Sequence, residues 1–197
     1  MKVTEAKQIT GSLTRTSKMP GLSYSLPAWE CMTGSKLRKV KGSVCSACYA
    51  LKGNYTRYKA ITAAQYDRLE KIKNSLWVAA MVVQVKRQKY FRWHDAGDVQ
   101  DLEHLNKIYS VCKLTPEVKH WMPTREAWIK NYLYNKPGNL VIRFSPPMIG
   151  QRNDSWPNSS MVVESGATCP APKQNNSCGD CRQCWDPLVK VVSYGKH

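Results

Sequence analysis

The chain of 197 residues is long enough for one domain with a sizeable core. Its longest apolar run, residues 76–83, is too short to span a bilayer, and its first residues lack the apolar segment of a signal peptide, so we expect a cytoplasmic protein with no membrane partner. Its net charge of +16 favours a polyanionic partner such as nucleic acid, although a solvated basic face explains the charge equally well.

Apolar residues recur at intervals that predict strands alternating with helices. Strands are expected at 21–27, 89–93, 118–123, 139–147, 159–165 and 188–194. Helices are expected at 56–74, 76–88, 102–112 and 124–134. This alternation is typical of a parallel sheet with right-handed crossovers. We therefore expect an α/β fold, either an incomplete βα barrel or an open parallel sheet, formed by residues 1–165 and followed by a cysteine-rich C-terminal appendage at 166–197 that packs on the same domain.

Ligands of such folds bind at the carboxyl ends of the parallel strands. The predicted strand ends bring several polar segments to this edge. They are the loop from Cys31 to Cys48, the turn HDAGD at 94–98, Thr124 and Arg125, Arg143 and Ser145, and Glu164. We expect all of them on one rim.

Four of the eight cysteines form a C-x8-C-x2-C-x2-C pattern near the C-terminus. They are Cys169, Cys178, Cys181 and Cys184. In a reducing compartment, this many cysteines indicate metal binding or redox chemistry rather than disulfides. The tandem C-x2-C-x2-C run is typical of ferredoxin-like iron–sulfur sites, whereas zinc sites more often use two separated C-x2-C pairs. The pattern favours an iron–sulfur cluster, with zinc as the alternative.

Three more cysteines, Cys31, Cys45 and Cys48, form C-x13-C-x2-C and lack a fourth ligand. The site is either open or completed from elsewhere. Cys112 lies on an apolar helical stripe, where a cysteine usually belongs to the core. His94 follows a strand, where a structural role is equally common. In a third arrangement, one zinc site would combine Cys45 and Cys48 with Cys181 and Cys184.

The segment around the first cysteines is rich in cations and aromatic residues. It includes KLRKVK at 36–41, and Tyr49, Tyr55 and Tyr58 alternate with Lys52, Arg57 and Lys59. Such a mixture suits base stacking beside phosphate contacts. The same tyrosines could equally be half-buried on a helix.

Three motifs carry a resemblance to known families. CSACYALKGNY, WHDAGD and CPAPKQNNSCGDCRQCW resemble the signatures of a phage family known as gene product eighty-eight, over the chain from Cys31 to Trp185. That name supplies no function. More distantly, the layout is similar to the radical SAM superfamily, which has a three-cysteine loop after the first strand, an acidic turn containing glycine after the second, and often a further cysteine cluster near the C-terminus. The usual C-x3-C-x2-C spacing is C-x13-C-x2-C here.

The second resemblance implies two 4Fe-4S clusters, one open at Cys31, Cys45 and Cys48 and one closed at the four C-terminal cysteines. The open cluster would bind S-adenosylmethionine. Asp95 and Asp98 would hold the ammonium group of that ligand. The carboxylate, or a substrate phosphate, would meet Arg125 or Arg143. Tyr49, His94 and Gly97 would line the cofactor site, and Asp98 has the plainer alternative of capping the helix that begins near residue 101.

Two functions remain open at this point. The first is a phage iron–sulfur enzyme of radical-SAM-like chemistry that acts on nucleic acid or another anionic substrate in the cytoplasm of the host cell. The second is a non-catalytic phage protein in which iron–sulfur or zinc stabilises a module that binds nucleic acid or a host protein.

Overall fold

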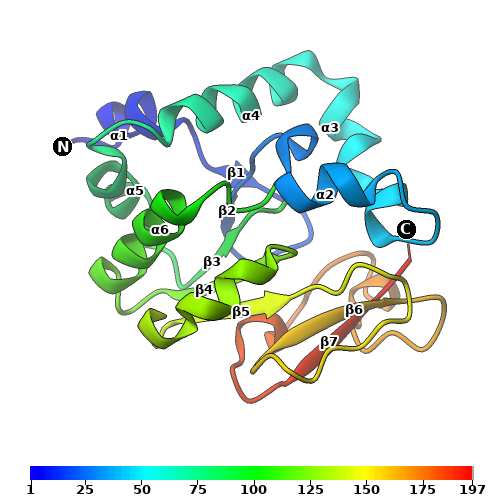
Figure 1. Ribbon diagram of the computed structural model, residues 1–197. Helices are drawn as coiled ribbons and strands as arrows, with labels where there is room; N and C mark the ends of the chain where they lie inside the picture. Colours follow the sequence, from blue (N-terminus) through cyan, green and yellow to red (C-terminus); the bar gives the residue numbers. More distant parts are fainter. Residues whose placement is uncertain (197) are drawn as a thin grey trace.

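Every strand of the single sheet lies beside its neighbour in the sequence (Figure 1). The structure is a computed structural model and describes residues 1–196. The strands are β1 (Thr14–Arg15), β2 (Leu22–Tyr24), β3 (Tyr90–Trp93), β4 (Lys119–Thr124), β5 (Leu140–Phe144), β6 (Ser159–Val163) and β7 (Val191–Gly195). Only the pairing of β1 with β2 is antiparallel. The expected α/β fold with a mostly parallel sheet is confirmed, and within the described residues the sheet does not close into a ring.

The helices form two groups, one of which packs against one face of this sheet. The α-helices are α1 (Val3–Thr10), α2 (Met32–Leu37), α3 (Asn54–Arg57), α4 (Lys59–Lys71), α5 (Trp77–Val85) and α6 (Leu102–Leu114). In Figure 1, α1, α5 and α6 lie together on the left, whereas α2 and α3 lie at the right end. Asp101 begins α6 by accepting a hydrogen bond from the backbone N–H of His104 at 2.7 Å, so Asp101 rather than Asp98 is the helix cap.

Short 3-10 helices make up most of the connections. They are η1 (Ala28–Glu30), η2 (Val44–Ala47), η3 (Tyr49–Leu51), η4 (Ala127–Asn135), η5 (Ala171–Lys173) and η6 (Gln183–Trp185). The α-helix expected at 124–134 is therefore the 3-10 helix η4. Among residues 1–196, we find no helix that is both long and apolar enough to cross a bilayer.

Alternate residues of the strands face two different environments, as the period of a strand requires. Phe91 and Trp93 on β3 and Met122 on β4 point into the apolar core beneath the helices, where each is fully buried. Tyr90 and Arg92 alternate with them and face the opposite side, and Arg92 is in register with Trp121 of β4. One face of the sheet is thus an apolar core, and the other carries aromatic and charged side chains.

The cysteine-rich C-terminal segment is not an appendage. It forms the crossover from β6 to β7, and β7 pairs in parallel with β6 over five residues. Trp185 in this crossover is 4% exposed, and its ring centroid lies 5.4 Å from that of Tyr90 and 5.2 Å from that of Trp121. The segment therefore covers the second face of the sheet. The strand expected at 188–194 is confirmed as β7, whereas no sequence pattern indicated which face of the sheet the cysteine-rich segment covers.

Two histidines in the apolar core remain uncharged when the protein is folded. Burial lowers the pKa of His104 and of His120 to about 3. His120 is 0% exposed, stacks on Trp93 with ring centroids 6.0 Å apart, and has Nε2 2.9 Å from Oγ1 of Thr115. An unfolded histidine titrates near pH 6.5. Each buried histidine therefore contributes stability that is complete above pH 6.5 and declines as the pH falls below it.

We predict that the stabilising contribution of His120 depends on pH. Between pH 6.5 and pH 3 it should fall by about 1.4 kcal/mol per pH unit, because only the unfolded chain binds the proton. The free energy of unfolding of the wild type relative to His120→Gln should therefore fall by about 2 kcal/mol between pH 6.5 and pH 5. Urea unfolding of both proteins at these two pH values measures it. A difference that does not change with pH would contradict the prediction.

Candidate metal centres

The carboxyl ends of β2 and β3 are joined by backbone hydrogen bonds. The N–H of His94 donates to the carbonyl of Tyr24 at 3.0 Å, and the N–H of Leu26 donates to the carbonyl of Ala96 at 2.9 Å. Gly97 has φ +80°, and a Cβ at this position would lie 2.6 Å from Cβ of Leu26. Gly97 thus allows the turn at 94–98 to approach the chain that leads to the cysteines. This structural role is separate from the role in cofactor binding that the sequence predicts.

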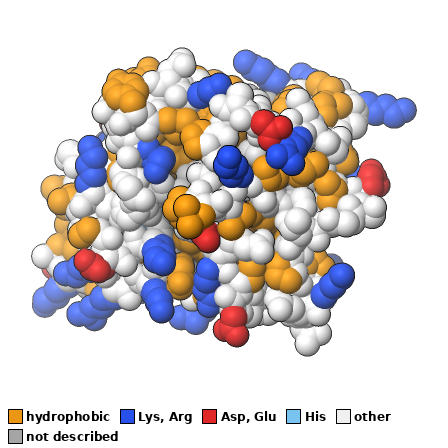
Figure 2. Space-filling model, turned by 90° about the horizontal axis from the view of Figure 1, so that it is seen from below, with side chains coloured by type: hydrophobic (Ala, Val, Ile, Leu, Met, Phe, Trp, Pro, Cys, Tyr) orange, Lys and Arg blue, Asp and Glu red, His pale blue; other side chains and the backbone are white. Residues whose placement is uncertain are grey.

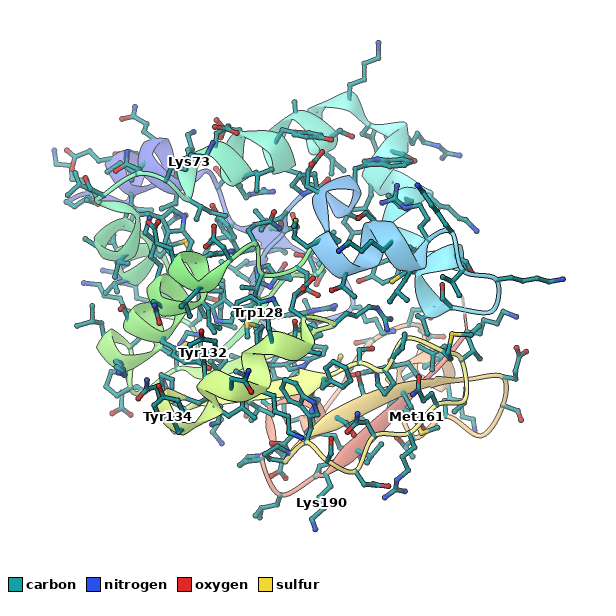
Figure 3. All side chains as sticks on the ribbon, viewed as in Figure 1. Lys73, Trp128, Tyr132, Tyr134, Met161 and Lys190 are labelled. Carbon is teal, nitrogen blue, oxygen red and sulfur yellow. The ribbon has the colours of Figure 1, made fainter. Side chains whose placement is uncertain are left out.

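Glu126 fastens the cysteine loop to the end of β4. Its carboxylate accepts hydrogen bonds from the N–H and the hydroxyl of Thr33 at 2.9 and 2.8 Å, and from Nε1 of Trp128 at 3.2 Å. Figure 3 labels Trp128 at the start of η4, with Tyr132 and Tyr134 farther along it. Glu126 is 3% exposed. The sequence analysis missed this residue, because only the fold brings Thr33 beside it.

The first three cysteines lie near one another, and Cys31 and Cys45 flank Gly34. Cys31 precedes α2, Cys45 lies in η2, and Cys48 precedes η3. A Cβ on Gly34 would lie 2.8 Å from Cβ of Cys31, 3.6 Å from its Sγ and 3.7 Å from Sγ of Cys45. The missing side chain of Gly34 therefore leaves the space between two sulfurs. We call these three residues the rim centre.

The thiols of the rim centre are buried beside other acidic groups. Burial raises the pKa of Cys31, and Asp98 and the two other cysteines raise it further. Burial also raises the pKa of Cys45, whereas the nearby cation of Arg125 opposes this rise. Burial favours the protonated thiol. A bound metal cation favours the thiolate and so opposes this effect. Three thiols are a donor set that suits a metal centre in its chemistry.

Asp98 connects the turn after β3 to the end of β4. Its carboxylate accepts hydrogen bonds from the N–H of Val99, the hydroxyl of Thr124 and the N–H of Arg125, each at 2.8 Å. Burial raises the pKa of Asp98 to about 7, and the hydrogen bonds from Arg125 and Thr124 limit that rise. Asp98 is 5% exposed, so its first role is to hold the two strand ends together.

The guanidinium of Arg125 bridges β4 and the chain after β5. It donates to the carbonyls of Ser145 at 3.0 Å and Pro146 at 2.6 Å. Both bonds use Nη1, and the side chain is half-buried near Cys45. Arg125 therefore places a positive charge beside the rim centre, as the strand-end rule predicted.

Asp95 faces two tyrosines of the cysteine loop. Tyr55 donates its hydroxyl to Oδ2 of Asp95 at 2.9 Å, and Tyr49 donates to the backbone carbonyl of the same residue. Oδ1 of Asp95 is buried and accepts no hydrogen bond from the described part of the chain. Asp95 thus retains one acceptor in the position that the sequence assigned to a ligand ammonium group.

His94 turns toward the helices. It has φ 55° and is 2% exposed, and its ring lies 5.4 Å from that of His104 and 6.4 Å from that of Trp93. Burial lowers the pKa of His94. The predicted cofactor residue thus packs against aromatic rings of the core.

The four C-terminal cysteines line one small pocket. Cys169, Cys178, Cys181 and Cys184 surround a cavity of roughly 20 Å³, together with Ala171, Trp185 and Val192 among others. The backbone N–H of Cys169 donates to Ser193 of β7 at 3.0 Å, and that of Cys178 donates to Lys18 at 2.8 Å. Burial raises the pKa of Cys184 to about 11, and its Sγ lies 3.2 Å from the hydroxyl of Tyr194. We call these four residues the crossover centre.

The positions of the cysteines answer two questions that the sequence left open, namely the role of Cys112 and the possibility of a shared zinc site. Cys112 is 0% exposed in the apolar core on α6, as its helical stripe indicated. Cys45 and Cys48 lie with Cys31, whereas Cys181 and Cys184 line the pocket of the crossover centre, so the structure does not assemble a mixed zinc site. As placed in residues 1–196, no three His, Cys, Asp or Glu side chains are close enough to hold a single ion.

Arg143 has a structural role that corrects the predicted ligand contact. Its side chain is 0% exposed, and its five N–H groups donate to backbone carbonyls at 2.7 to 3.4 Å. The acceptors are Ser159, Gln183, Cys184, Asp186 and Val189. Because every donor is used within the fold, Arg143 has none left for a substrate. It anchors the crossover centre to β5.

We predict that Gly34→Ala prevents metal binding at the rim centre. The added methyl group would lie 2.8 Å from Cβ of Cys31 and between the sulfurs, so the cysteines must move apart. Gly138→Ala is the matched control, because its Cβ would meet nothing within 4 Å. Elemental analysis of both variants should show metal loss only for Gly34→Ala. Alanine favours a helix over glycine by about 1 kcal/mol, so this loss should not reflect unfolding. Full metal content in Gly34→Ala would remove the rim centre from consideration.

The comparison with protein families identifies the chain at the family level. A family model described as Gene product 88 matches residues 1–187. No curated protein and no solved structure matches the chain. The family match confirms the resemblance drawn from the three sequence motifs and supports a phage gene product, but it adds nothing to the more distant similarity. The chain belongs to the Gene product 88 family.

Proposed function

We propose that the protein is an iron–sulfur protein with two cysteine centres, one of which is open to a ligand. One observation carries this proposal. Seven of the eight cysteines fall into two spatial groups, three in the loop around Cys31 and four around one pocket, and the eighth lies in the core. Cysteines that serve only as small apolar residues pack singly in a core and do not form such groups.

Iron–sulfur explains the ligand sets better than zinc does. A structural zinc ion requires four ligands in a tetrahedron, and the rim centre supplies three. The crossover centre supplies four, but in the tandem spacing of ferredoxin-like sites. We therefore assign a cluster to each centre.

The open centre would give the protein an enzymatic function of the radical-SAM-like type. An open iron of such a cluster can bind the amino and carboxyl groups of S-adenosylmethionine and supply an electron for its cleavage. Two residues of this chain suit the ligand. Arg125 places a cation beside Cys45, and Oδ1 of Asp95 is a buried acceptor without a partner in the described chain. Asp98 would position Arg125 through its backbone rather than contact the ligand.

The location of the rim centre supports this proposal. It follows β2, the first of six parallel strands, at the edge where ligands of βα folds bind. The acidic turn follows β3, the next strand in the sheet. The sequential strand order is also the order of an incomplete βα barrel. The crossover centre lies on the face of the sheet and would stabilise the β6–β7 connection.

We predict that Cys181→Ala loses one cluster and that Cys112→Ala keeps both. Metal centres contribute on the order of 10 kcal/mol to small metal-dependent folds, so losing a ligand should lower the free energy of unfolding by several kcal/mol. The buried Cys112 should cost only about 1 kcal/mol of packing. Iron per chain and visible absorption after anaerobic purification measure the outcome, and Cys178→Ala should repeat the loss. A colourless wild type with stoichiometric zinc would refute the iron–sulfur assignment.

A second candidate function is nucleic-acid binding through the cysteine loop. Trp29 is 48% exposed, and the guanidinium of Arg38 lies 4.4 Å from the centroid of its ring. Tyr58, between α3 and α4, is 52% exposed. Exposed rings beside cations suit stacked bases and phosphates. Elsewhere the positive charge is dispersed, since Figure 2 shows Lys and Arg scattered between apolar side chains over another face.

We predict that the basic loop binds single-stranded nucleic acid in a salt-dependent way. The test variant changes Lys36, Arg38, Lys39 and Lys41 to Gln. Each lost phosphate contact should flatten the plot of log affinity against log salt by about 0.7 to 0.9. The matched control changes the exposed Lys113, Lys119, Lys130 and Lys190 to Gln. An equal slope in both variants would mean that the loop is only a solvated face and would favour a host protein as the partner.

A further inference from the structure

A hollow of about 320 Å³ lies beside the rim centre. Residues of the segment 47–55 line it, and two of them, Ala47 and Tyr49, flank Cys48 in the sequence. Tyr55 also lines the hollow and packs against the same small apolar cluster as Cys31 and Cys48. Pockets for small ligands begin at about 300 Å³, so the hollow has room for one small group. A group bound there would lie next to the rim centre.

Two tyrosine rings form walls of this hollow. The ring centroids of Tyr49 and Tyr55 are 5.9 Å apart, and the ring planes meet at 63°. Asp95 holds both rings at their hydroxyl ends, since Tyr55 donates to its Oδ2 at 2.9 Å and Tyr49 donates to its backbone carbonyl. Asp95 itself is 1% exposed. Rings that are fixed in this way lose little conformational freedom when a ligand binds, so the aromatic walls are preorganised.

The cations around the hollow have no acidic partners. Lys52 lines the hollow, and Arg57 and Lys59 follow it closely in the chain. All three side chains are exposed, and no Asp or Glu of residues 1–196 forms an ion pair with any of them. The segment 49–59 contains no acidic residue. Aromatic walls beside unpaired cations complement a base and its phosphates, whereas an apolar side chain of a protein would make no use of the charges.

We propose that the hollow binds one base of a single-stranded nucleic acid. The base stacks against the tyrosine walls while Lys52 contacts a neighbouring phosphate. A single strand is required, because the bases of a duplex are already stacked and paired. The inference rests on the second candidate function and deepens it, since it supplies a base contact that the cations at 36–41 cannot make. The bound nucleotide lies next to the rim centre, which gives the proposed cluster a substrate class.

The test compares two labelled oligonucleotides of equal length, one of thymidines and one with an abasic backbone. Their binding to the full-length, iron-loaded protein is measured by fluorescence anisotropy at several salt concentrations. Both carry the same phosphates, so only a base contact distinguishes them. At equal salt the wild type should bind the thymidine oligonucleotide about tenfold more tightly, as expected for one stacked base.

Four variants assign this preference to the hollow. Tyr55→Leu should lose most of the preference, whereas Tyr55→Phe keeps the ring and should retain it. Tyr134→Leu is the matched control and should also retain it, because Tyr134 is 80% exposed on η4, away from α3 (Figure 3). Lys52→Gln should keep the preference but flatten the plot of log affinity against log salt by about 0.7.

The outcomes separate the base pocket from the functions on which it builds. Equal affinity of the wild type for the two oligonucleotides would overturn the base pocket, leave the basic loop intact as a phosphate contact and favour a protein side chain as the occupant. A wild type that binds neither oligonucleotide would overturn the second candidate function as well. A preference that persists in both Tyr55→Leu and Tyr49→Leu, or that Tyr134→Leu loses equally, would also overturn the pocket. The wild-type comparison needs no substitution, so a variant that misfolds or loses iron does not affect it.

Discussion

The carboxylate of Asp98 joins the turn after β3 to the end of β4, and the cysteine loop is built on the edge that this contact creates. Three hydrogen-bond donors surround the carboxylate, which compensates for its removal from water. Three consecutive residues at the end of β4 then make further contacts. Thr124 binds Asp98 through its hydroxyl, Arg125 reaches the chain after β5, and Glu126 holds Thr33 beside Cys31. Without the contact between Asp98 and Thr124, the contacts of Arg125 and Glu126 would lose the backbone position from which they start.

The second face of the sheet depends on a different buried charge. The crossover from β6 to β7 has little regular structure, so many of its carbonyls lack partners in helices or strands. Buried carbonyls need donors, and Arg143 supplies five hydrogen bonds to them or to their neighbours. Arg143 therefore holds the cysteine-rich crossover against the second face of the sheet. Arg143 is fully buried on this face, whereas Arg92 is partly exposed and packs over the ring of Trp121.

Function has to be argued from these sites rather than from the fold. Sequential parallel strands occur in proteins of many activities, and the family match names no reaction. The features that distinguish this chain are chemical. One group of thiols lies at the ligand-binding edge near the cation of Arg125, and the other lies on the second face of the sheet near Arg143. A cation near a thiol favours its thiolate form.

Sequence patterns alone predict the alternation of strands and helices, the rim that follows the strands, and the place of Cys112 in the core. Periodic apolar residues specify these features, because burial of one face requires a fixed spacing. The sequence also predicts that the cysteine loop and the turn at 94–98 meet, since parallel strands end on one edge. Spacing could not tell whether the seven other cysteines form separate groups, because spacing along the chain does not fix distance across it.

Only the tertiary structure decided the roles of the charged residues. Arg143 and Arg125 look alike in the sequence, yet one is consumed by backbone carbonyls and the other lies beside a thiol. Glu126 and Arg92 carried no signal at all, because their partners are distant in sequence. Local periodicity records which side of an element is apolar. A polar side chain acquires its role from whichever groups the fold places within hydrogen-bond distance, and those groups come from other elements.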